Sequence, residues 1–156
     1  PPNFKAPSDN HDYMKQLKNA LSNGSDWISV YKAELEAQGG HQSASPSFFL
    51  NSARAMASTG GLPKEILKVA TNCLETGLDD IQLLRSVGYL LLSVDDCLQH
   101  AIGIFDRVRQ LAPCEPQSFL DSALSRFLKS SRLFHGSMGA DSPTHHELVD
   151  DIHDAQ

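Results

Sequence analysis

The chain has 156 residues, of which 40% are apolar, and carries a formal net charge of −6 at pH 7. That length is enough for one domain with a hydrophobic core. No stretch approaches the roughly 18 consecutive apolar residues of a membrane-spanning helix, which argues against a membrane protein. The 13 basic residues are scattered along an acidic chain, which argues against nucleic acid as a partner.

The three cysteines, Cys73, Cys97 and Cys114, form no CxxC pair. An odd number of cysteines without metal-binding spacing favours reduced structural thiols and a cytoplasmic protein. No secretory leader opens the sequence, which begins with Pro1 and Pro2 in place of an initiator Met. We therefore expect a fragment of a longer polypeptide, and we predict no cofactor.

The amino-terminal part of the chain predicts a lead-in followed by two helices. Residues 1–10 hold three prolines and no periodic apolar pattern, which is typical of a linker. Apolar residues then recur at helical spacing from Tyr13 until Asn23-Gly24. Ser25 or Asp26 starts a second helix, which Gly39-Gly40 ends.

The middle of the chain predicts two further helix pairs. The first begins at Ser45-Pro46, because serine caps a helix and proline fits its first turn. Gly60-Gly61 separates its two helices. In the next pair, Asp79 or Asp80 caps a helix that is apolar around most of its circumference, so we expect it to be buried on more than one side. Asp95-Asp96 marks the turn that follows.

A last helix begins at Pro116 and is predicted to run to about residue 133. The predicted helical domain thus covers residues 11–134. Residues 135–156 predict a weakly ordered acidic tail, in which Ser142-Pro143 can start a short helix.

Three blocks of sequence repeat at an interval of 35 residues. In register are a bulky residue (Phe49, Leu84, Phe119) and a tiny one (Ala53, Gly88, Ala123). A period between 20 and 50 residues is typical of stacked repeats. We expect the tiny residues to mark close approach between the helices of a pair, and the bulky ones to fill the space between successive pairs.

This pattern resembles the tetratricopeptide repeat (TPR), and the central repeat carries it best, with Val87-Gly88, Ala101, Phe105 and Pro113. A closer resemblance is to the repeat segment of proteins that join a VIT-type domain to a carboxy-terminal domain of unknown function. Residues 45–50, 82–89 and 115–121 carry that resemblance. It implies an all-α fold, a right-handed stack of antiparallel helix pairs (a TPR-like α-solenoid) with about seven helices. It implies no activity.

In this class the first helices of the pairs line a concave groove. The resemblance places these residues in it: Asn51, Arg54, Gln82, Arg85, Tyr89, Gln117 and Asp121. Arginine offers a bidentate fork to a peptide carboxylate. We predict a non-catalytic protein-interaction module that binds a peptide or helix in this groove, within a larger protein. The alternative is a solvated helix surface, with the domain acting as a structural spacer or as a homo-oligomer formed through its carboxy-terminal helix.

Two patterns suggest chemistry only faintly. His146, Asp150 and His153 share one face of a hypothetical helix, as metal ligands can, but a solvated acidic helix explains them better. Cys97 and His100 stand three residues apart, but no third residue would orient a catalytic thiol. Because GxSxG and HExxH are absent too, we predict neither an enzyme nor a metal site.

Overall fold

The structure, a computed structural model, describes residues 10–76 and 80–138. In these residues the chain forms seven α-helices and two short 3-10 helices. They are α1 (Asn10–Ser22), α2 (Trp27–Ala37), α3 (Pro46–Ser58), α4 (Pro63–Asn72), η1 (Cys73–Thr76), α5 (Ile81–Leu92), η2 (Asp95–Cys97), α6 (Leu98–Leu111) and α7 (Pro116–Met138). The all-α class and the number of helices that the sequence predicts are confirmed.

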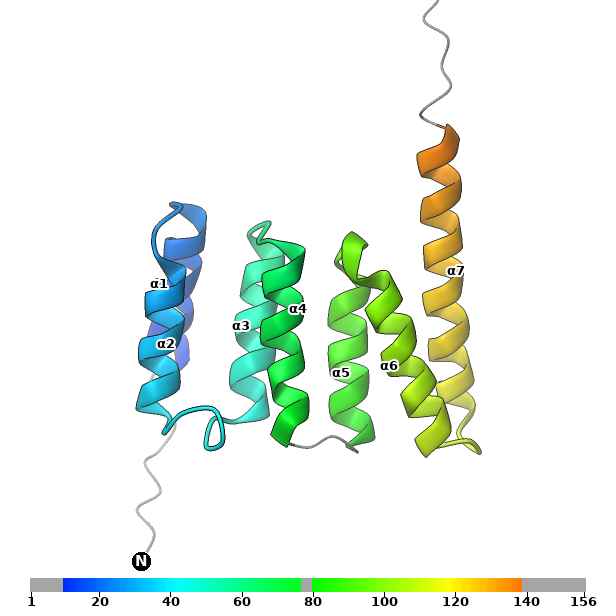
Figure 1. The fold of residues 1–156 in the computed structure, drawn as a ribbon, viewed down its shortest axis with the longest axis horizontal. Coiled ribbons are helices and arrows are strands. Elements are labelled where there is room, and N and C mark those ends of the chain that lie inside the picture. Colours follow the sequence, from blue (N-terminus) through cyan, green and yellow to red (C-terminus); the bar gives the residue numbers. More distant parts are fainter. Residues whose placement is uncertain (1–9, 77–79, 139–156) are drawn as a thin grey trace, which may run out of the picture.

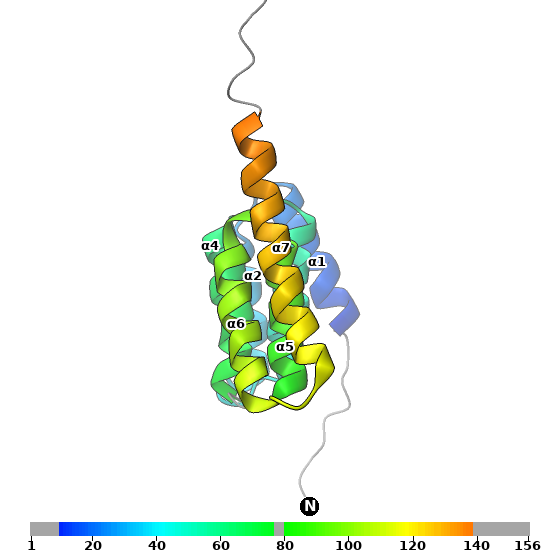
Figure 2. The same ribbon diagram turned by 90° about the vertical axis from the view of Figure 1, so that its right-hand side faces the viewer.

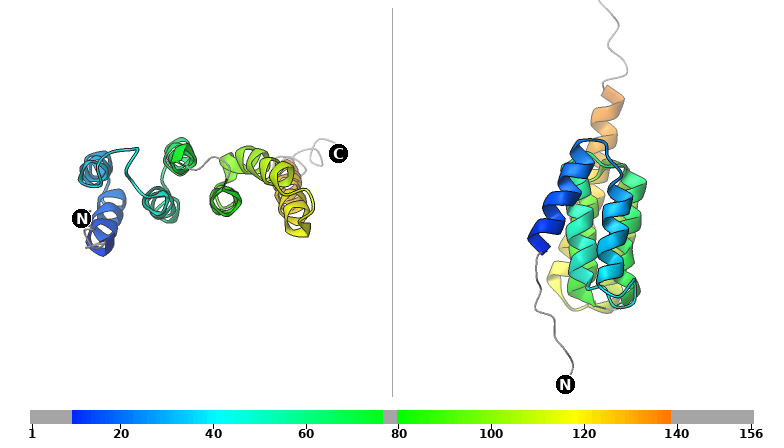
Figure 3. Two further views of the ribbon diagram at one scale, coloured as in Figure 1. Left: turned by 90° about the horizontal axis from the view of Figure 1, so that it is seen from below. Right: turned by 90° about the vertical axis from the view of Figure 1, so that its left-hand side faces the viewer.

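The helices stand side by side in the order of the sequence (Figure 1). Each odd-numbered helix through α5 packs against the helix that follows it, and α7 packs against α6. Seen from below, the odd-numbered helices form one row and the even-numbered helices a second row (Figure 3, left). The sequential packing of pairs predicted from the repeat is therefore present.

Short polar residues cap three of these helices where the sequence predicts a start. The Asp26 carboxylate accepts from the backbone N–H of Ser29 (3.2 Å), and the Ser45 hydroxyl accepts from Phe48 (3.3 Å). The Asp80 carboxylate caps α5 in the same way. Each cap satisfies a backbone donor that the helix itself cannot.

The core runs through the middle of the stack, where α3 and α5 lie between neighbours. Phe49, Met56, Val87 and Leu91 are fully buried there. At Gly88 a β-carbon would lie 2.7 Å from Cζ of Phe105 on α6, so only glycine permits this approach. The close approach of the two helices of a pair, expected at Gly88, is confirmed.

The expectation for the last repeat block is wrong. Phe119 is 50% exposed and Ala123 is exposed, whereas their counterparts on α3 and α5 are buried. The physical reason is that no helix follows α7 within the described residues. α7 also runs to Met138, five residues beyond the predicted end near residue 133.

Candidate functional site

The seven predicted groove residues lie on three odd-numbered helices, α3, α5 and α7. On α3, the Arg54 side chain is exposed and Asn51 is half-buried. Gln82 is exposed in the first turn of α5. The other four, Arg85, Tyr89, Gln117 and Asp121, form one hydrogen-bonded cluster between α5 and α7.

Arg85 is the centre of this cluster. Its Nε donates to Oδ2 of Asp121 (3.0 Å), and its two terminal nitrogens donate to the two carboxylate oxygens of Glu115 (3.1 and 2.7 Å). Nη2 also lies 3.3 Å from the Ser118 hydroxyl. The guanidinium therefore binds carboxylates of this chain in the fork geometry expected for a peptide carboxylate.

Tyr89 and Gln117 complete the cluster on its solvent side. The Tyr89 hydroxyl donates to Oδ1 of Asp121, and Nε2 of Gln117 donates to the same oxygen (2.7 Å). Asp121 thus accepts from three side chains that come from two helices. Such a network fixes the geometry of its members, because every charge in it is paired.

Burial separates these residues into two kinds. Arg85 is 7% exposed and Asp121 is 1% exposed, whereas Tyr89 and Gln117 face solvent. The hydrogen bonds to Glu115 raise the pKa of Arg85, and those from Arg85 lower the pKa of Glu115. The hydrogen bond to Asp121 raises the pKa of Tyr89, because an ionised hydroxyl could not donate it. Arg85 and Asp121 therefore form the buried part of the cluster, and Tyr89 and Gln117 form the part that faces solvent.

Sequence reasoning missed Glu115 and Ser118 as members of this cluster. Glu115 precedes α7 and Ser118 lies in its first turn, and in the sequence both look like ordinary polar residues at the start of a helix. A signal was present: Ser118, Asp121, Ser122 and Ser125 recur at helical spacing, which indicates a polar stripe. The structure buries that stripe.

Most of the apolar residues of α7 lie on the side opposite the polar stripe, whereas Leu128 is partly buried against the core. We define the apolar face of α7 as Phe119, Leu120, Ala123, Leu124 and Phe127. The four large side chains are 44–67% exposed. Figure 2 shows α7 at the end of the stack, with nothing drawn as helix on its outer side. These four large apolar side chains are therefore exposed together on one face of α7.

Polar contacts hold α7 against its neighbours along its length. On α6, Asp106 accepts from Ser122 (3.0 Å) and Arg126 (2.6 Å). Nearer the other end, Arg132 pairs with Asp95. Burial opposes ionisation of Asp106, but the hydrogen bonds from Arg126 and Ser122 outweigh it, so the pKa of Asp106 lies below its usual value.

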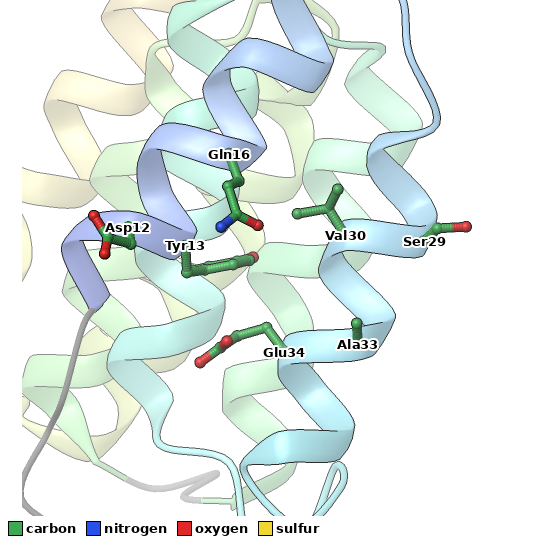
Figure 4. Close-up of a pocket in the computed structure, with 7 residues that line it drawn as sticks. All are labelled: Asp12, Tyr13, Gln16, Ser29, Val30, Ala33 and Glu34. Carbon is green, nitrogen blue, oxygen red and sulfur yellow. The ribbon is translucent and has the colours of Figure 1, made fainter.

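Clefts lie elsewhere on the molecule. One of about 580 Å³ opens between α1 and α2. Tyr13, Gln16 and Glu34 point into it, whereas Ser29 points away (Figure 4). The Tyr13 hydroxyl is hydrogen-bonded to Ser52 (2.8 Å), and burial raises its pKa to about 12. A tyrosine held in this way is a structural group, not an acid or base for chemistry near pH 7.

Two more clefts, of about 640 and 590 Å³, lie between α4 and α6 in the row of even-numbered helices. Both are mainly apolar, and His100 lines both. Cys97 lines the second, where its thiol is buried and lies 3.6 Å from the carbonyl of Pro63. Burial raises the pKa of Cys97, so its thiolate is disfavoured. The arrangement offers no activated thiol.

No cluster of metal-ligating side chains occurs among residues 10–76 and 80–138. His146, Asp150 and His153, the metal ligands weighed above, lie outside the described residues. No described helix is long and apolar enough to cross a membrane.

Comparisons with protein-family models, with curated proteins and with solved structures give no match. The fold therefore defines the class of this chain, an all-helical domain of seven helices packed in sequential pairs.

Proposed function

We propose that this chain is a right-handed, TPR-like α-solenoid that acts as a non-catalytic protein-interaction module. Its ligand is an extended peptide or a helix that lies across the row of odd-numbered helices. The support comes from the 35-residue repeat, from the paired packing and from the side chains that the odd-numbered helices present to solvent.

Tyr89 is the observation that carries this proposal. Tyr89 is 44% exposed, yet its ring packs edge-on against Phe105 with ring centroids 5.2 Å apart. Its hydroxyl is fixed by Asp121. Binding of a partner to this ring costs little side-chain entropy, because the Tyr89 side chain is already ordered before binding. Tyrosine held in this way is typical of binding hot spots.

Arg54, Gln82 and Gln117 extend this surface. All three are exposed, and they lie on three successive odd-numbered helices. Glutamine amides donate to and accept from a peptide backbone, and Arg54 offers a fork to a carboxylate. The surface therefore combines one rigid aromatic ring with hydrogen-bonding groups on both sides of it.

Selection from a displayed library of random peptides tests the proposal. We expect selected peptides to lose about tenfold or more in affinity with Tyr89→Ala and with Arg54→Glu. Tyr89→Phe should lose less, since it keeps the ring. Lys68→Glu on α4 is the control for Arg54→Glu, because it makes the same charge change in the other row. Peptides that respond to Lys68→Glu and ignore both odd-row variants would refute the proposed surface.

The role of a structural spacer or homo-oligomer, the alternative from the sequence, stays a prediction. The surface that a homo-oligomer would use is the apolar face of α7. We also propose a cytoplasmic location, which the odd number of cysteines and the lack of CxxC spacing support.

A further inference from the structure

A cleft of about 350 Å³ lies between α2 and α4, which are neighbours in the row of even-numbered helices (Figure 3, left). Trp27, Ile28 and Leu35 of α2 and Val69 of α4 line it with apolar surface. Pockets that hold small ligands are mostly apolar, with a few polar groups that fix the orientation of the ligand. The polar groups of this cleft therefore decide what it can hold.

Tyr31 is the polar residue of the cleft that most requires a partner. It is 8% exposed, and its hydroxyl makes no hydrogen bond to any of the described residues. Its ring is fixed, stacked on Phe48 with centroids 5.3 Å apart and edge-on to Trp27 at 6.3 Å. Burial raises the pKa of Tyr31, so the hydroxyl keeps its proton and can donate it to an acceptor. A buried hydroxyl without a partner is destabilising, because it has lost its hydrogen bonds to water.

Asn72 and His41 contribute two further polar groups to the cleft. The Asn72 amide lies close enough to the Tyr31 hydroxyl to oppose the rise in its pKa, but does not form a hydrogen bond with it. Nδ2 of Asn72 lies 3.4 Å from Nε2 of His41, which is long for a hydrogen bond. Asn72 is half-buried and is the last residue of α4, so its side chain is weakly held and can turn aside. An acceptor in the cleft could then reach the Tyr31 hydroxyl, which is otherwise shielded from water.

The charged side chains of the cleft favour a ligand with one negative charge. Lys32 of α2 and Lys68 of α4 line it from opposite sides, and both are exposed. Glu65 is half-buried in the same cleft, so two lysines and one glutamate leave one positive charge. Lys68 lies one helical turn before Asn72 and therefore shares its face of α4. A carboxylate can accept from both a lysine ammonium and a tyrosine hydroxyl.

We propose that this cleft binds a carboxylate attached to an apolar group, either a small amphipathic acid or the carboxyl terminus of a peptide that ends in an apolar residue. The carboxylate accepts from the Tyr31 hydroxyl and pairs with Lys68, and the apolar group lies against Trp27 and Val69. The site is in the other row from the surface proposed above for peptide binding, and it does not depend on that surface.

Trp27 is the only tryptophan of the chain, so its fluorescence reports binding in this cleft. The probes are phenylbutyrate and an acetylated Leu-Phe dipeptide with a free carboxyl group, each compared with its uncharged amide. We expect both acids to give a saturable change and to bind about tenfold or more tightly than their amides. Tighter binding of the dipeptide assigns the carboxylate to a chain terminus, and tighter binding of phenylbutyrate to a free acid. No saturable change with either acid, or equal affinities for acids and amides, would overturn the proposal.

Tyr31→Phe separates a hydroxyl that binds a ligand from one that only supports the fold, because it keeps the ring. We expect Tm of the free protein to rise by about 2 °C or more, since an unpartnered buried hydroxyl is removed. Acid binding should weaken about fivefold or more, and amide binding should not change. A fall in Tm would show that the hydroxyl already has a partner in the free protein, and would overturn the proposal.

Lys68→Gln tests the charged part of the site. It should weaken binding of the acids about fivefold or more without changing that of the amides, because it removes the positive charge beside the carboxylate. Lys64→Gln is the matched control, since Lys64 lies one turn earlier on α4 and does not line this cleft. Acid binding that is unchanged in both Tyr31→Phe and Lys68→Gln would place the ligand elsewhere and overturn the proposal.

Discussion

The helices α3 and α7 carry the same repeat block but are held in opposite ways. α3 buries apolar side chains, among them Phe49, Ala53 and Met56, each at 0% exposure. α7 buries Ser118, Asp121 and Ser125 and exposes its apolar face. The middle of the stack around α3 thus rests on dispersion and the hydrophobic effect, and the end formed by α7 on directional hydrogen bonds and ion pairs.

The difference has physical consequences. Apolar contacts around α3 depend on how well the side chains fill the volume between the helices. The contacts of α7 depend on paired charges. The Arg85 guanidinium is paired with the Asp121 carboxylate, and the Asp106 carboxylate with the Arg126 guanidinium. Losing one member of a buried ion pair costs more than the pair contributes, since the other member stays buried and uncompensated. The following variants test this contrast, beginning with the largest effect.

Phe49→Ala should give the largest loss. The ring is fully buried and stacks 5.2 Å from the ring of His41. Its removal leaves a cavity, and we expect the free energy of unfolding to fall by about 3–5 kcal/mol. Denaturant titration measures this loss. Leu62→Ala is the control, because Leu62 is 64% exposed and its change should stay within about 0.5 kcal/mol. Similar losses for the two variants would show that α3 does not form the core described.

Arg85→Ala should cost about 3 kcal/mol, because it leaves the carboxylate of Asp121 buried at 1% exposure. The double variant Arg85→Ala with Asp121→Ala should recover part of this loss, since no buried charge then remains. A double-mutant cycle by urea unfolding measures the coupling. Strictly additive losses would mean that the ion pair does not hold α7 to α5.

Gly88→Ala tests the close approach of α5 and α6. The added β-carbon would lie 2.7 Å from Phe105, so we expect a loss of about 1–3 kcal/mol. Gly103→Ala on α6 is the matched control, because no atom lies within 4 Å of its added β-carbon. That variant should gain about 0.5–1 kcal/mol, as alanine favours helix interiors. Changes of the same sign in thermal unfolding would contradict the packing.

The sequence predicted what local rules and periodicity control. Caps at Asp26, Ser45 and Asp80 lie where short polar side chains precede apolar stripes, and each satisfies a backbone donor in its own helix. The close approach at Gly88 followed from register. These features depend on neighbours within a few residues or on a repeat visible in one chain.

The arrangement around α7 could not be predicted in the same way. The repeat register placed Phe119 inside because Phe49 and Leu84 are inside, and register does not show whether a covering helix is present. The repeat resemblance places Arg85 in the groove by its position in the register, and register does not show which side chains of the next repeat it pairs with. Its burial depends on Asp121 and Glu115, which lie 36 and 30 residues away. Pairing over such a distance leaves no local pattern.

Acid should loosen α7 before it affects α3, and this is the smallest effect expected. The pKa of Asp106 is lowered in the folded state, so its contribution is complete above the unfolded value near 4 and is lost as pH falls through the folded value. The pKa of Glu115 is lowered as well, so its contribution to stability is also lost as the pH falls. For the half-buried Asp106 we expect about 0.5–1 kcal/mol, since the pair with Arg126 is partly solvated.

Hydrogen exchange at pH 6 and pH 3 resolves this effect helix by helix. Amides of α7 should lose protection at pH 3 relative to those of α3, after correction for the intrinsic exchange rate. Asp106→Asn should reduce the difference, because its amide does not titrate, whereas Glu36→Gln on α2 should not. Salt at 1 M should weaken α7 in the same direction at pH 6, since it screens the pair of Asp106 and Arg126. Uniform loss of protection across α3 and α7 would mean that the polar end of the stack is not the acid-sensitive one.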